Sequence, residues 1–388
     1  MSSKRLAQGT DRLFLRDWRF WAGVAVSVLF LGILVYQVDL VEIQRSLRQA
    51  NYLYVIPAIA LYFVAVYFRA VRWRYLLSPI ASFQVSRLYP VVVIGYLANN
   101  LLPARLGELV RAYYLSQREH CSASTALATV MVERVYDGLT LLLFAVATAP
   151  VLLMLGQFHG YGNLSGATAS LLAAGVVGIF LTALLVLTLL AKTSANGAVA
   201  GWFLRFVPTV QGRDKIQGLV HAFIQGLGIL NSPGKHLALL LLSLPIWLLE
   251  GSMYFLVGFS FGLNELFSSV WVFMLAALLL TATSNLVTAL PAAMGGIGPF
   301  ELVAQVTLVA LGGDPSVAGA YAAFLHLVTL WLPVNLAGLA LLWTQNISLK
   351  QLTSAPSVPA SPGPVADAGH AASGEPSSER FGPAKDVT

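Results

Sequence analysis

Ionisable side chains inside an apolar segment give the first indication of chemistry in this sequence. The segment VMVERVYDGLTLL carries Glu133, Arg134 and Asp137, and a helix would place Glu133 and Asp137 on one face because they are four residues apart. Ionisable groups at membrane depth cost about 2.5–3.5 kcal/mol each, so they usually face a protein interior or a watery cavity. The three residues would either bind a polar ligand or form a structural ion network between helices.

Two further motifs combine such charges with residues that break helices. The first is NNLLPARLGELVR, from Asn99 to Arg111, and the second runs from Ser284 to Leu302 with SNLV followed by LPAAMGGIGPFEL. Both contain Asn-Leu, Leu-Pro-Ala, Gly and Glu-Leu in the same order. Gly and Pro that interrupt apolar segments at matching positions of two halves indicate broken helices at a central binding site. A half-helix N-terminus there would attract anions, and Pro299 suits its first position.

Single titratable residues lie inside two other apolar segments, Glu250 in one and His326 in the other. A buried acid such as Glu250 or Asp137 could bind and release a proton and so couple the movement of a bound ligand to a proton gradient. Alternatively, Glu250 could pair with an arginine, and His326 could be a satisfied polar group. The six histidines are scattered, there is one cysteine, and no nucleophile with its base and no P-loop is recognisable. We therefore expect no catalytic residue, no metal and no cofactor.

The composition requires these residues to be positioned by membrane helices. Of 388 residues, 57% are apolar and 10% are charged, with a mean hydropathy of +0.75. A soluble fold could not bury so much apolar surface, which excludes a soluble enzyme, a nucleic-acid binder and a disordered regulator. The net charge is +6, and 14 of the 40 charged residues lie in positions 1–19 and 347–388, so the charge mostly sets topology.

The pattern of apolar segments predicts an all-α, polytopic transmembrane bundle with about six full spans. A span needs about 20 apolar residues. The predicted spans are 20–38, 51–68, 122–155, 167–191, 236–262 and 316–343. We expect 84–117 and 268–312 to form two re-entrant helical hairpins in an inverted repeat. The alternative is that both are kinked full spans whose glycines serve helix packing.

The segments between the spans predict the topology and the domains. Residues 1–19 form a basic N-terminus and 192–235 a basic loop, so the positive-inside rule places both, and both chain ends, in the cytoplasm. Residues 20–345 are the membrane domain, and 346–388 form a disordered tail. Segment 39–50 predicts a short amphipathic interfacial helix. We interpret Arg69, Arg72 and Arg74 beside Trp73 as an interfacial anchor after the second span.

The motifs NNLLPARLGELVRAYYL, VMVERVYDGLTLL, LPAAMGGIGPFELV and HLVTLWLPVNLAGL together resemble the flippase-like membrane domain of lysylphosphatidylglycerol synthases. The resemblance covers roughly residues 15–345. It implies a lipid-translocating, multi-pass protein of a bacterial or archaeal inner membrane. In two-domain relatives a soluble domain synthesises the lipid; here only the tail follows, so synthesis is not implied and we predict no enzymatic activity.

The resemblance also implies which residues bind a lipid headgroup. The family's polar motif positions correspond to Arg105, Gly107, Glu108, Arg111, Glu133, Arg134, Asp137, Pro291, Gly295, Gly296, Gly298 and Glu301. The family often carries Arg where this chain has His326, which raises the chance of a pH-sensitive or different headgroup site.

The leading hypothesis is a flippase-like transporter of a phosphate-bearing phospholipid or aminophospholipid, or of a polyprenyl-phosphate-linked lipid. Arg105 and Arg134 would hold the phosphate with the half-helix N-termini at 104–107 and 298–301. The acids would orient the arginines or bind an amino headgroup. The alternatives are a membrane enzyme that modifies lipids or glycolipids, and an accessory scaffold for a lipid-modifying enzyme. Membrane lipids are the expected partners, and nucleic acid is not.

Overall fold

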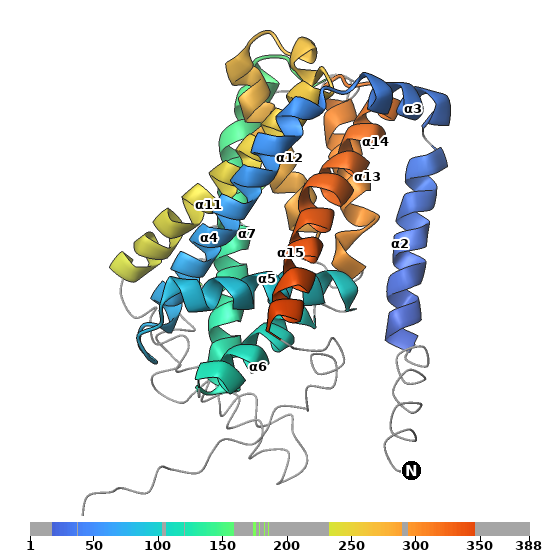
Figure 1. Cartoon of the computed structure of the whole chain (residues 1–388). Coiled ribbons are helices and arrows are strands. Elements are labelled where there is room, and N and C mark those ends of the chain that lie inside the picture. The colour runs from blue at the N-terminus through green and yellow to red at the C-terminus, as the bar shows by residue number, and fades with distance from the viewer. Residues whose placement is uncertain are drawn as a thin grey trace, which may run out of the picture.

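The computed structural model describes residues 18–36, 38–102, 106–119, 121–158, 233–288 and 294–345, with a few single positions between 174 and 185. All regular elements in these ranges are helices (Figure 1). They are α2 (Trp18–Tyr36), α3 (Leu40–Gln49), α4 (Val55–Leu77), α5 (Val85–Leu101), α6 (Gly107–Glu119), α7 (Ala123–Met154), α11 (Pro233–Ser260), α12 (Val270–Val287), α13 (Pro299–Ala310), α14 (Pro315–Phe324), a π-helix (Leu325–Trp331) and α15 (Leu332–Thr344).

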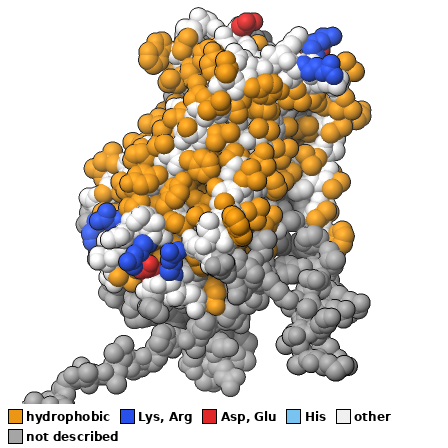
Figure 2. Space-filling model, viewed as in Figure 1, with side chains coloured by type: hydrophobic (Ala, Val, Ile, Leu, Met, Phe, Trp, Pro, Cys, Tyr) orange, Lys and Arg blue, Asp and Glu red, His pale blue; other side chains and the backbone are white. Residues whose placement is uncertain are grey.

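Five helical segments are long and apolar enough to cross a membrane, which confirms a multi-pass, all-helical chain. They are Tyr52–Leu77, Ala123–Met154, Gly234–Ser260, Val270–Val287 and Pro315–Thr344. A sixth candidate is Ser27–Tyr36 together with Leu40–Gln49, which meet at 89°. The predicted span 167–191 apart from a few single positions, nearly all of the loop 192–235 and the tail 346–388 lie outside the described residues. Figure 2 shows hydrophobic side chains over most of the visible face, as lipid contact requires.

The amphipathic helix expected at 39–50 is present as α3. Asp39 caps it, because its Oδ1 accepts a hydrogen bond of 2.8 Å from the backbone N–H of Val41. The sharp bend after α2 turns α3 across the end of the bundle (Figure 1). Its location at the membrane surface remains a prediction.

The second span is longer than expected, and this corrects the interpretation of its basic end. The sequence predicted an end at residue 68, whereas α4 continues to Leu77. Arg69 and Arg72 are buried inside the bundle, and only Arg74 is exposed. Residues three and four apart share a helix face, so Arg69, Arg72 and Trp73 all point inward while Arg74 points away. Arg69 and Arg72 are therefore not an interfacial anchor.

Both predicted motifs fall between a longer and a shorter helix. Helix α5 ends at Leu101 and α6 begins at Gly107, while α12 ends at Val287 and α13 begins at Pro299, as expected for that proline. The helices of each pair pack against each other. In Figure 1, α5 crosses the axes of α4, α7 and α15 in the lower half, and α12 and α13 lie in the upper half.

Gly107 packs closely against the backbone of α5 and gives a stability prediction. A Cβ atom at Gly107 would lie 2.3 Å from the backbone N of Asn99 and 2.4 Å from the carbonyl oxygen of Gly95. Gly107→Ala should therefore lower the free energy of unfolding by about 1–3 kcal/mol through overpacking. Chemical unfolding in detergent measures this change. Gly32→Ala on α2 is the matched control, because its Cβ would meet nothing within 4 Å; equal stability of both variants would contradict the packing role.

Candidate functional site

The core of the candidate site is the inward face of α7. Glu133 and Asp137 lie one turn apart and both are buried, as their spacing predicted. Arg134 extends from the same turn, and its Nη2 lies 3.2 Å from Asp137 Oδ2. Because α7 is one continuous helix of 32 residues, it carries all three charges deep into the bundle.

Arginines from two other helices neutralise the acids of α7. Arg72 of α4 lies with Nη1 2.8 Å from Asp137 Oδ1 and with Nε 3.8 Å from Glu133 Oε1. Arg111 of α6 lies with Nη1 2.7 Å from Glu133 Oε2. Its guanidinium carbon is 3.7 Å from the centre of the Trp73 ring, a cation–π arrangement.

Arg69 links this group to α11. It forms a buried ion pair with Glu250, and its Nη1 is 3.5 Å from Asp137 Oδ2. Trp247 donates a hydrogen bond of 3.1 Å from its indole N–H to Asp137 Oδ1. The guanidinium of Arg69 also lies 4.6 Å from the centre of the Trp247 ring. Glu250 is thus paired with an arginine, which was one of the two alternatives that the sequence allowed for it.

Among the described residues, the resulting network contains as many cations as anions. We call it the ion network; its members are Arg69, Arg72, Arg111, Arg134, Glu108, Glu133, Asp137 and Glu250. Buried charges are tolerated only when paired, because desolvation of each ion is costly. Arg134 differs from the other three arginines: its side chain is 26% exposed, against 6% or less for them.

A second polar pair lies at the start of α13. Glu301 accepts a hydrogen bond of 2.6 Å from the backbone N–H of Gly298 through Oε2, while its Oε1 lies 2.7 Å from His326 Nδ1. The ring of Phe300 stacks on His326 at 4.3 Å between centres. The carboxylate of Glu301 therefore occupies the N-terminus of α13 that the sequence suggested for a phosphate.

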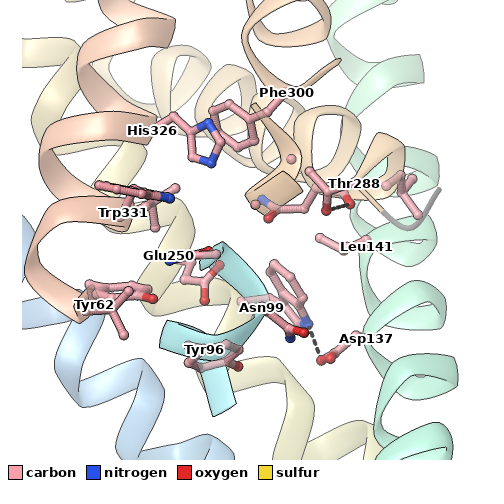
Figure 3. A pocket seen from close by; sticks show the side chains of 18 of the residues that line it. Tyr62, Tyr96, Asn99, Asp137, Leu141, Glu250, Thr288, Phe300, His326 and Trp331 are labelled. Atoms are coloured by element: carbon pink, nitrogen blue, oxygen red, sulfur yellow. Dashed lines mark hydrogen bonds between the residues drawn. The ribbon is translucent and has the colours of Figure 1, made fainter. Parts of the chain in front are cut away.

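A cavity of about 210 Å³ separates the ion network from the Glu301–His326 pair (Figure 3). We call it the central cavity. Its lining comes from α4, α5, α7, α11, α12, α13, α15, the turn before α13 and the π-helix. The lining residues used below are Tyr62, Arg69, Tyr96, Asn99, Arg134, Asp137, Trp247, Glu250, Gly295, Gly296, Phe300, His326 and Trp331. The π-helix carries His326 and Trp331 at its two ends, and such helices are frequent at functional sites.

The comparison with known families agrees with this arrangement. The family described as the lysylphosphatidylglycerol synthase TM region matches residues 20–337. The chain belongs to this family. The match spans α2 to the middle of α15, so it includes both broken motifs, the ion network and the central cavity.

Three relatives show what this lysylphosphatidylglycerol synthase TM-region protein is similar to. A UPF0104 membrane protein of Methanothermobacter thermautotrophicus is 26% identical over 80% of this chain and 90% of its own length. The UPF0104 membrane protein PH1989 of Pyrococcus horikoshii is 23% identical over 84% of this chain and 97% of its own. Glycosyltransferase AglD of Haloferax volcanii is 25% identical over 84% of this chain but only 54% of its own. No solved structure matches.

The structure divides the predicted site residues into those that line the central cavity and those that do not. Six predicted residues line it: Arg134, Asp137, Glu250, Gly295, Gly296 and His326. Glu108, Arg111 and Glu133 lie behind this wall in the ion network, and Glu301 holds His326. Gly298, at φ 100°, faces α2, where a Cβ would lie 2.9 Å from the carbonyl oxygen of Ser27. Arg105 and Pro291 lie outside the described residues.

Sequence reasoning missed several residues of the site. Arg69 and Arg72 were attributed to the membrane surface, and Tyr62, Tyr96 and Trp331 were not distinguished from other aromatic residues. The signal that could have found the arginines is their separation by three residues within a long apolar segment, since one helix face would then carry both.

Proposed function

We propose that this protein is a flippase-like transporter of a phosphate-bearing lipid in the bacterial inner membrane. The observation that carries the proposal is a polar central cavity lined by Arg69, Arg134, Asp137 and Glu250 within a bundle of membrane-spanning helices. Charges at this depth usually mark a pathway or a site for a polar substrate. The substrate would be a phospholipid, an aminophospholipid or a polyprenyl-phosphate-linked lipid.

The size of the cavity supports binding of a headgroup alone. Pockets for drug-sized ligands measure about 300–1,000 Å³, whereas this one has about 210 Å³. The headgroup would enter it while the acyl chains stay in the bilayer. The phosphate would contact Arg134, the arginine of the ion network that is most accessible.

The paired breaks support an inverted-repeat mechanism. The pairs α5–α6 and α12–α13 would be re-entrant hairpins from opposite faces of the membrane, with both chain ends in the cytoplasm. In this arrangement α12 would be a hairpin arm, although it is also long and apolar enough to cross a membrane. Rocking of one repeat against the other would then open the central cavity to each side in turn.

A flipping assay tests the proposal directly. Purified protein is reconstituted in vesicles with fluorescently labelled phosphatidylglycerol or phosphatidylethanolamine, and dithionite bleaches the label on the outer leaflet. We expect bleaching beyond the half that protein-free vesicles lose. Equal bleaching with and without protein, for both lipids and with or without an imposed pH gradient, would argue against transport.

Coupling to protons would involve Glu250 or Asp137, and Glu250 is the simpler one to test because, within the described part of the chain, it forms an ion pair only with Arg69. Protonation of Glu250 would release Arg69 to a phosphate. Glu250→Gln should make flipping insensitive to a pH gradient, and chemical unfolding in detergent shows whether the variant is folded. The exposed Glu265 provides the control variant Glu265→Gln, which should keep the response. A preserved response in Glu250→Gln would remove this residue from the coupling.

The second candidate is an enzyme that modifies a lipid-linked sugar, favoured by the name of the Haloferax volcanii relative. This chain covers 54% of that relative. Product formed from a polyprenyl-phosphate sugar donor by the purified protein would rank this function first. A scaffold for a lipid-modifying enzyme would instead copurify with that enzyme and tolerate substitution of the ion network.

A further inference from the structure

The Glu301–His326 pair differs from the ion network in its cation. Among the described residues, each acid of the ion network faces at least one arginine, whereas Glu301 forms its ion pair with His326. An arginine keeps its charge at every physiological pH. Histidine is the side chain whose charge ordinarily changes between about pH 5 and pH 8. One wall of the central cavity therefore has fixed positive charges, and the wall that carries His326 has one that depends on pH.

Glu301 and Phe300 fix the orientation of the His326 ring. A carboxylate only accepts, so the Nδ1–H of His326 donates to Oε1 of Glu301 at 2.7 Å, while Oε2 accepts from the backbone N–H of Gly298. Phe300 stacks on the ring, with 4.3 Å between the two centres. The hydrogen bond at Nδ1 can persist whether or not the other ring nitrogen, Nε2, carries a proton.

The nitrogen Nε2 is the part of this pair that reaches the central cavity. His326 lines the cavity, whereas Glu301 does not, and Figure 3 shows one ring nitrogen of His326 turned towards the open centre. Nε2 has no hydrogen-bond partner among the described residues and still keeps accessible surface, unlike the buried Nε1 of Trp331. A ligand in the cavity can therefore contact Nε2 without displacing the ring.

The other charged or titratable groups that line the cavity come from other helices. They are Tyr62 and Arg69 of α4, Tyr96 of α5, Arg134 and Asp137 of α7, and Glu250 of α11. The arginines keep their charge, each of the two acids is paired with one of them, and tyrosine ordinarily titrates at about pH 10.

The remaining helices around the Glu301–His326 pair bring no further charge to it. Helices α12 and α15 contain no titratable residue, and Tyr321 of α14 donates to the carbonyl oxygen of Tyr254. Arg19 is the one charged residue of α2, and it lies eight residues, or about 12 Å, before Ser27, which Gly298 faces. The pH-dependent charge of the cavity therefore lies at His326.

Protonation of Nε2 reverses what the pair offers to a ligand. With a neutral His326, the pair has the negative charge of Glu301, and Nε2 can only accept a hydrogen bond. When Nε2 takes up a proton from water, it becomes a donor and the pair has no net charge. We propose that His326 is a proton switch of the central cavity, which holds an anionic headgroup through Nε2–H when protonated and disfavours that headgroup when neutral.

The proposal rests on the headgroup site inferred above and specifies its regulation. The switch at His326 acts on the affinity for a headgroup when the pH is equal on both sides of the membrane. It therefore differs from the gradient coupling tested at Glu250.

The pH dependence of lipid affinity tests the switch without requiring movement. The probe is dioctanoyl phosphatidylglycerol, whose phosphodiester keeps its negative charge throughout, and its Kd for the full-length protein in detergent is measured from about pH 5.5 to about pH 8.5. We expect the Kd to rise about 10- to 100-fold over this range, the effect of losing one hydrogen bond to a charged group. His326→Gln takes up no proton, and its Kd should change by less than about twofold. His326→Arg stays charged and should bind the probe across the whole range.

A second histidine supplies the matched control, His236→Gln. His236 lies near the start of α11, hydrogen-bonds with Tyr136 and does not line the cavity, so this variant should keep the wild-type pH dependence. A wild-type Kd that is constant or falls as the pH rises would overturn the proposal, as would no binding at any pH. A folded His326→Gln protein that keeps the pH dependence, or its loss in His236→Gln, would overturn it too.

Nitrogen NMR of the protein labelled with nitrogen-15 histidine gives a second measurement that needs no lipid. The signal of His326 is the one that His326→Gln lacks. We expect it to show a proton on Nδ1 alone at high pH and on both ring nitrogens at low pH. A signal that stays the same over the whole pH range would contradict the switch.

The two proposals can fail separately. A pH-dependent Kd in a protein that fails the flipping assay would reject the transport function and leave the switch at His326 in place. A protein that flips lipid but binds the probe equally at every pH would reject the switch and leave transport in place.

Discussion

Replacing Arg72 by methionine is expected to lower the free energy of unfolding by about 3–5 kcal/mol. Arg72 is fully buried and contacts three groups: Asp137 at 2.8 Å, Glu133 at 3.8 Å and the hydroxyl of Ser243 at 2.7 Å. Methionine fills similar space but removes one positive charge that faces two buried carboxylates. Removing one partner of a buried ion pair is costly because the remaining charge stays desolvated.

Chemical unfolding in detergent, followed by tryptophan fluorescence, measures this loss. Arg74→Met, two residues further along the same helix and exposed, should change stability by no more than about 0.5 kcal/mol. Adding Glu133→Gln to Arg72→Met should recover part of the loss, since it restores the charge balance. An Arg72→Met protein as stable as the wild type would mean that the ion network does not hold the bundle together.

The fold class was predictable because a bilayer imposes simple lengths. About 20 apolar residues are needed to span it, and apolar segments with Gly and Pro breaks indicated where helices would end. Helices α5 and α13 end and begin close to the residues expected from those motifs. The end of α4 was misplaced by nine residues, since a charge was taken to mark the membrane surface.

The ion network was only half predictable. Glu133 and Asp137 carry their own signal, because their spacing puts two acids on one face of an apolar helix. Their cationic partners come from distant parts of the chain: Arg69 and Glu250, for example, are 181 positions apart. Such pairing depends on how helices pack, which one sequence does not specify. The local sequence with Arg69, Arg72 and Trp73 is the same whether these side chains face lipid headgroups or the protein interior.

Glu301 carries a local signal that has a structural explanation besides the predicted ligand role. A glutamate at the third position of a helix commonly accepts from the N-cap backbone N–H. Glu301 does so with Gly298 and also contacts His326. The half-helix N-terminus thus already has an anion, and the arginines around the cavity become the stronger candidates for a phosphate.

Arg134→Ala should reduce lipid flipping by about 10- to 100-fold, the second large effect expected here. Among the arginines of the ion network, its side chain is the most exposed, at 26%, and it lines the central cavity. A hydrogen bond to a charged group contributes about 1.5–3 kcal/mol, which corresponds to a loss of that size if the bond to phosphate forms during transport. Arg134→Lys keeps the charge but loses the planar fork, so it should retain an intermediate rate.

The flipping assay with labelled phosphatidylglycerol gives these rates, and unfolding in detergent shows whether each variant is folded. Arg74→Ala removes an exposed arginine of α4 and should flip lipid at the wild-type rate. Arg134 also contacts Asp137 at 3.2 Å and Glu108 at 3.7 Å, so a purely structural role would lower stability and rate together. A folded Arg134→Ala protein with an unchanged rate would remove Arg134 from the headgroup site and leave Arg69 as the cation beside the cavity that a phosphate could reach.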